Sequence, residues 1–80
     1  MARYFLHLRQ GTDEALDDEG VEVGTFDALK AKVLAAARDT MSHDLREGQL
    51  LLYLRIDAED EAGSIAYSLP FAEALHISYG

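Results

Sequence analysis

The chain has 80 residues, 49% of them hydrophobic, and its 15 acidic and 7 basic residues give a formal net charge of −8 at pH 7. This length corresponds to a single domain, residues 1–80, while the hydrophobic content excludes a disordered chain and the lack of cysteine excludes disulfides, thiolate metal sites and a cysteine nucleophile. No apolar run is long enough to span a bilayer and the first residues lack the pattern of a signal peptide, so we expect a cytoplasmic protein.

A first strand is predicted at residues 3–10, where side chains alternate with the period of a β-strand. One face carries apolar side chains: Tyr4, Leu6 and Leu8. The other face carries basic and aromatic side chains: Arg3, Phe5, His7 and Arg9. After a turn that contains Gly11, a short acidic edge strand is expected within residues 15–23.

One long helix is predicted at residues 25–47, the only long run with helical spacing. The hydroxyl of Thr25 can cap its first turn, and Gly48 is the expected stop. The apolar stripe of this helix must be buried against another element, and the strands before and after the helix can form the sheet that buries it. The stripe consists of Phe26, Leu29, Val33, Ala37, Met41 and Leu45.

The strongest strand is predicted at residues 50–57. Its first five residues are all apolar, so both faces of the strand would be apolar. In a strand that is covered on one side only, apolar and polar side chains should alternate. Leu51 and Tyr53 therefore imply either a second covered face or a contact surface.

A second hairpin is predicted next, with a turn at residues 60–63 and a fourth strand at 64–69 that Pro70 ends. Residues 71–75 can form a helical turn. The predicted fold class is α+β with the order ββαββ: one long helix packed on one face of an antiparallel four-stranded sheet. The order of the strands in the sheet stays open. The sheet face that meets the helix is expected to carry Tyr4, Leu6, Leu8, Leu50, Leu52, Leu54, Ile56, Ile65, Tyr67 and Leu69.

Several motifs follow one another along the chain: RYFLHLR at residues 3–9, LDDEG at 16–20, the alanine-rich helix, DEAG at 60–63 and LPFAEAL at 69–75. In this order they resemble a family of very small bacterial proteins known only as a domain of unknown function. The resemblance covers nearly the whole chain and implies a compact bacterial domain, with no activity, ligand or catalytic residue. A second, looser similarity is to antitoxins of the HicB type, whose small domain also lays a helix on an antiparallel sheet.

No motif indicates catalysis, a metal ion or a cofactor, and we expect none of the three. His7, His43 and His76 lack the spacing of metal ligands, although His7 lies on the sheet face away from the predicted helix. Acidic clusters at residues 13–19 and 57–61 do not match a calcium loop and are explained more simply as solvated turns and edge protection. The serine and threonine residues lack the context of a nucleophile.

The sheet face away from the predicted helix is the most informative surface, because it combines three basic residues with aromatic ones in an acidic protein. Such a mixture suits a protein interface and equally suits single-stranded nucleic acid. A net charge of −8 opposes a polyanion, so we favour protein contact, most simply with a second copy of the chain. The candidate interface consists of Arg3, Phe5, His7, Arg9, Leu51, Tyr53 and Arg55.

These observations favour a non-enzymatic interaction or regulatory module that forms a homodimer through this face or a strand edge, with an unidentified protein partner. A small-ligand protein or an enzyme is a further hypothesis, and it would need a sizeable cavity beside His7. An ordinary half-solvated sheet face is also compatible with the pattern. The alternative is an antitoxin-like or nucleic-acid-associated regulator that uses Arg3, Phe5, Arg9, Tyr53 and Arg55.

Overall fold

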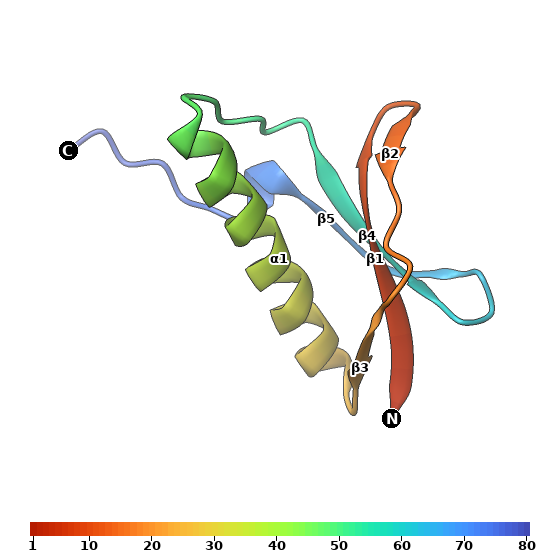
Figure 1. The fold of residues 1–80 in the computed structure, drawn as a ribbon. Helices are drawn as coiled ribbons and strands as arrows, with labels where there is room; N and C mark the ends of the chain where they lie inside the picture. Colours follow the sequence, from red (N-terminus) through yellow and green to blue (C-terminus); the bar gives the residue numbers. More distant parts are fainter.

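One long helix packs against one face of an antiparallel sheet in the computed structural model, which describes residues 1–80 (Figure 1). The strand order is β2, β1, β4, β5, and β3 also pairs with β1. This confirms the predicted α+β class, with five strands where four are predicted. The elements are β1 (Ala2–Gln10), β2 (Asp13–Ala15), β3 (Val21–Val23), α1 (Phe26–Arg46), β4 (Arg55–Asp60), β5 (Ile65–Pro70) and the 3-10 helix η1 (Phe71–Glu73).

The predicted acidic edge strand is divided into two strands of three residues each. β2 pairs with the end of β1 and β3 with its beginning, while residues 16–20 leave the ladder between them. Gly20 permits this departure because its φ is +79° and a Cβ at this position would lie 2.9 Å from the carbonyl oxygen of Tyr4. Only glycine fits such a position without strain.

Helix α1 begins and ends as predicted. The Oγ1 of Thr25 accepts a hydrogen bond of 3.0 Å from the backbone N–H of Ala28, which satisfies one free donor of the first turn. At the other end Gly48 has a φ of +82°, and the N–H of Gln49 bonds to the carbonyl of Asp44. This left-handed glycine closes the last turn by satisfying its carbonyls.

The predicted strand at residues 50–57 is wrong in its position, because β4 begins only at Arg55 and continues to Asp60. The leucine run has no ladder partner and forms a turn and irregular backbone. Its last residue, Leu54, is buried, and its carbonyl accepts a hydrogen bond of 2.8 Å from the N–H of Phe71. Strand position is thus set by pairing with β1 and β5, not by local hydrophobicity.

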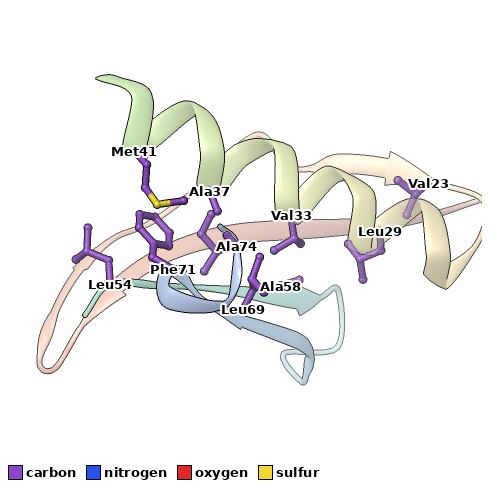
Figure 2. Close-up of a cluster of buried hydrophobic side chains, with 11 residues drawn as sticks. Val23, Leu29, Val33, Ala37, Met41, Leu54, Ala58, Leu69, Phe71 and Ala74 are labelled. Atoms are coloured by element: carbon purple, nitrogen blue, oxygen red, sulfur yellow. The ribbon is translucent and has the colours of Figure 1, made fainter. Parts of the chain in front are cut away.

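The core lies between α1 and the sheet (Figure 2). Four helix residues are buried in it, whereas Phe26 and Leu45 at the two ends of the predicted stripe are half exposed. Phe26 nevertheless packs edge-on against Tyr67, with ring centroids 5.7 Å apart. The core comprises Val23, Leu29, Val33, Ala37, Met41, Leu54, Ile56, Ala58, Leu69, Phe71 and Ala74.

Two residues expected on the sheet face that meets the helix, Leu50 and Ile65, are neither in the core nor packed against it. Leu50 lies outside the sheet and is exposed. Ile65 changes face because the pairing of β4 with β5 skips Ala66: Ala58 pairs with Tyr67, and Glu59 pairs with Ile65. A bulge of one extra residue reverses the alternation beyond it, so Ile65 stands opposite Glu59 and is 46% exposed.

Candidate functional site

The far face, defined as the face of the sheet away from α1, carries five of the seven candidate interface residues. Tyr4, Leu6 and Leu8 pack against the core, so the alternate residues of β1 lie on the far face. Cross-strand pairing adds residues of β4 to them. The predicted residues that lie on this face are Arg3, Phe5, His7, Arg9 and Arg55.

Leu51 and Tyr53 do not belong to the far face, because the segment that contains them is not a strand. Leu51 is half buried and packs against the core. Tyr53 is 62% exposed. The apolar character of this run therefore serves the core in part and does not mark a second sheet face.

Asp57 is the centre of a polar network on the far face. Its side chain is buried and accepts hydrogen bonds from Arg9 (2.9 Å), Arg55 (3.2 Å) and the hydroxyl of Ser68 (2.5 Å). Burial alone would raise the pKa of Asp57, but the hydrogen bonds from Ser68, Arg9 and Arg55 outweigh it and lower that pKa below its usual value. The hydrogen bonds to Asp57 and Glu14 raise the pKa of Arg9. The carboxylate and guanidinium groups of the network are therefore ionised, and their opposite charges compensate one another.

His7 is buried on the same face, with both ring nitrogens engaged. Its Nδ1 accepts a hydrogen bond of 3.1 Å from the backbone N–H of Asp17, which assigns the ring proton to Nε2. Nε2 lies 3.1 Å from the Oε1 of Glu59 and donates to it. The ring of Phe5 stacks on His7 with an interplanar angle of 7°. His7 thus has a structural role, and neither nitrogen is free for a substrate or a metal ion.

Asp17 attaches the segment at residues 16–20 to β1. Its carboxylate accepts hydrogen bonds from the backbone N–H groups of Leu6 (3.1 Å), Glu19 (3.1 Å) and Gly20 (3.2 Å). Burial raises the pKa of Asp17, but these three bonds outweigh it, and the pKa is lowered below its usual value. Sequence reasoning missed this role, although an Asp three residues before a Gly between short strands is typical of such a local turn.

Each arginine of the far face has a carboxylate partner within the chain. Arg3 pairs with Glu22 at 2.6 Å, and Arg9 and Arg55 share Asp57. No buried side-chain nitrogen or oxygen lacks a hydrogen-bond partner. No group of three or more histidine, aspartate or glutamate side chains is arranged to hold a metal ion. The far face therefore offers little uncompensated positive charge.

The two edges of the sheet differ in length and charge. One edge consists of β2 and β3, which have three residues each and contain Asp13, Glu14 and Glu22. The other edge is β5, whose six residues include no charged side chain and pair only with β4. Short, charged edges discourage pairing with another chain, whereas an uncharged edge permits it. Sequence reasoning included a strand edge as a contact surface but did not identify β5 as that edge.

An open groove lies beside the second half of α1. Figure 1 shows the end of α1, the segment before β4 and the chain after η1 at the same end of the molecule. The groove has a volume of about 550 Å³, and its lining is apolar apart from Ser42 and two arginines. It is lined by Arg38, Met41, Ser42, Leu45, Arg46, Leu50 and Leu75. Sequence reasoning missed this site, because its members come from three separate segments.

Comparison with known proteins assigns a family to this chain. A family model described as "Domain of unknown function (DUF6894)" matches residues 3–72. No curated protein and no solved structure matches the chain. None of these findings supports the looser similarity to HicB-type antitoxins, which stays a hypothesis. Neither helix combines the length and the apolar character that crossing a membrane requires.

Proposed function

Because the chain belongs to the family described as Domain of unknown function (DUF6894), we propose its function from its own surfaces. It is a non-enzymatic interaction module that forms a homodimer through the free edge of β5. Two copies of β5 would pair antiparallel about a two-fold axis and join both sheets into one. The cytoplasmic location expected from the sequence stays a prediction.

The contrast between the two sheet edges carries this proposal. The β5 strand, Ile65–Pro70, is uncharged, and Ile65, Ala66 and Ser68 are exposed along it. Pro70 removes one donor from the outer edge, because the N–H of the next residue, Phe71, points toward β4. The remaining backbone groups of the outer edge are free to pair with a second strand. A protein with this acidic excess needs such a neutral strip for self-association, since like charges would otherwise repel.

The far face gives less support for dimerisation than the β5 edge does. Its charged side chains satisfy one another, and His7 and Asp57 are buried within the single chain. Burying such a network under a second subunit would cost desolvation without gaining new partners. The same pairing counts against the alternative of an antitoxin-like or nucleic-acid-associated regulator, because phosphates would have to compete with carboxylates for Arg9 and Arg55.

A charge placed on the β5 edge tests the proposed dimer. Ala66→Lys adds a charge to an exposed edge residue, and Ala15→Lys adds the same charge to the exposed edge strand β2. Sedimentation velocity should give the unmodified protein a mass of twice the 8.8 kDa chain. We expect Ala66→Lys to reduce this mass to that of one chain, with an unchanged circular dichroism spectrum, and Ala15→Lys to leave it unchanged.

Two results would contradict the proposal. One is a mass of a single chain for the unmodified protein across the micromolar to millimolar range. The other is an unchanged dimer in Ala66→Lys. If Ala15→Lys alone dissociated the dimer, the interface would lie on the β2 and β3 edge instead.

A further inference from the structure

We propose that the groove beside the second half of α1 binds an acidic amphipathic segment of a partner protein. The apolar side chains of that segment would lie on the groove floor, and its carboxylates would pair with Arg38 and Arg46. This inference concerns a different surface from the β5 edge and shares no residue with it. The inference names the kind of partner that the proposed interaction module would bind.

The groove floor is apolar and accessible. Leu45 is 56% exposed and Leu50 is 37% exposed, while Met41 is buried at the base and Leu75 is half buried. Single exposed leucines are common on protein surfaces, but four apolar side chains gathered around one hollow indicate an interaction site. Because the groove is open, it suits a chain segment better than a small molecule, which needs most of its surface enclosed.

The two arginines of the groove lack a carboxylate partner, unlike the other arginines of the chain. There are five arginines, and the three on the sheet each have a carboxylate partner. Arg38 and Arg46 have none, and both line the groove. In a chain of net charge −8, two unpaired guanidinium groups beside an apolar floor complement a partner that is both acidic and apolar.

The side chain of Arg38 is already oriented by a hydrogen bond within the free chain. Its Nε donates a hydrogen bond of 2.9 Å to the carbonyl oxygen of Ala74, which ties the guanidinium to the segment after η1. The two Nη groups remain available for a carboxylate, and a guanidinium already oriented loses less entropy on binding.

The spacing of the two arginines favours an acidic helix over a single anionic group. Arg38 and Arg46 are eight residues apart on α1, which corresponds to roughly 12 Å along the axis. Carboxylates two turns apart on a partner helix are separated by roughly 11 Å, with apolar side chains between them. This is the helix-in-groove mode of recognition. A second copy of the chain offers no such free segment, because its acidic stretches lie in turns ordered by Asp17 and Asp60 and in strands already paired within the sheet.

Peptide binding tests the groove directly. The probe is a blocked, fluorescently labelled synthetic helix with leucine on one face and glutamates two turns apart, and the control peptide has lysine in place of each glutamate. Fluorescence anisotropy with the full chain should show binding of the glutamate peptide alone. Arg38→Gln and Arg46→Gln should each weaken this binding by about 5-fold, and Leu45→Gln should weaken it as well. Lys32→Gln, an exposed cation on the same helix, should leave it unchanged.

Several results would overturn this inference. They are equal binding of the lysine peptide, indifference to the loss of both arginines, or no binding of the glutamate peptide at all. Displacement of the peptide by micromolar dodecanoate, with the same dependence on the arginines, would instead assign the groove to a small amphiphile. If Leu45→Glu halved the sedimenting mass while Ala66→Lys did not, a second copy would occupy the groove.

Discussion

Gly20 shows how one backbone position holds the edge of the sheet. Its φ is +79°, and a Cβ would lie 2.9 Å from the carbonyl oxygen of Tyr4 and 3.1 Å from the ring of Phe5. Neither the carbonyl nor the paired strand β1 can move away. The motif residue Gly20 thus has a steric explanation that does not depend on any ligand.

Gly20→Ala is expected to lower the free energy of unfolding by about 1–3 kcal/mol, the cost of a strained backbone position. Urea denaturation followed by circular dichroism measures this change. Gly24→Ala is the matched control, because nothing lies within 4 Å of its added Cβ, and we expect it to change stability by no more than about 0.5 kcal/mol. Equal effects of the two substitutions would refute the steric explanation.

Asp17 and Asp57 predict how stability depends on pH. The pKa of each is lowered in the folded chain, so at pH values above the usual aspartate pKa of about 3.9 both states are ionised and the stabilisation is complete. Below that value the unfolded chain takes up protons first, and the stabilisation is lost as pH falls toward the folded pKa.

Urea denaturation at pH 7, 5, 4 and 3 should therefore show stability that falls most steeply below about pH 4. Asp17→Asn should reduce the steepness of this fall, because it removes one of the two depressed carboxylates. Asp18→Asn is the control, since the neighbouring Asp18 is exposed and makes none of the hydrogen bonds described for Asp17. An unchanged pH profile in Asp17→Asn would show that its carboxylate does not contribute.

At the scale of elements, β4 and the leucine run before it show that charge can be more important than hydrophobicity. Strand β4 reads RIDAED and carries more acidic than apolar side chains. It is nevertheless an inner strand of the sheet, because β1 faces it with Arg9 and His7 and β5 faces it with Ser68. The more hydrophobic run before it has no such partners and stays outside the sheet.

The short helix η1 closes the core under α1. Phe71 is fully buried, and its N–H bonds to the carbonyl of Leu54, where the chain enters β4. In Figure 2 its ring lies below Met41 and beside Leu54. The LPFAEAL motif therefore has a packing role, in which Phe71 and the buried Ala74 complete the second half of the core.

Phe71→Ala is expected to cost about 3–5 kcal/mol, because it leaves a cavity between α1 and the sheet. A domain of this size has little stability to lose, so a fraction of the variant should be unfolded at 37 °C in a thermal melt. Ala72→Ser, at the exposed neighbouring position, should melt like the unmodified protein. A melting temperature of Phe71→Ala within a few degrees of the unmodified value would show that η1 does not belong to the core.

At the scale of the whole molecule, charge distinguishes the two surfaces that we propose for association from the rest of the surface. The far face is neutralised internally, and the β2 and β3 edge is acidic. The uncharged β5 edge and the groove with Arg38 and Arg46 remain. Since the two share no residue, a dimer through β5 would still present two grooves, and two linked sites bind a repeated partner more tightly than one.

Local interactions explain what the sequence determined by itself. The cap at Thr25, the stop at Gly48, the alternation of β1 and the turn before β5 each depend on residues close together in the chain, and all were predictable. Four of the five candidate interface residues that lie on the far face, Arg3, Phe5, His7 and Arg9, follow from the same alternation of β1. The family-specific motifs could likewise be recognised from their order alone.

The tertiary structure decided every feature that depends on distant partners. The start of β4 follows from pairing across the sheet, as in the bond from Arg9 to Asp57 over 48 residues. The bulge at Ala66 moved Ile65 to the other face, and the groove joins α1 to Leu50 and Leu75. The periodicity of a sequence reports only interactions between residues that are close together in the chain. Strand register, the exposure of a sheet edge and the shape of a groove depend instead on which distant segments pair with one another.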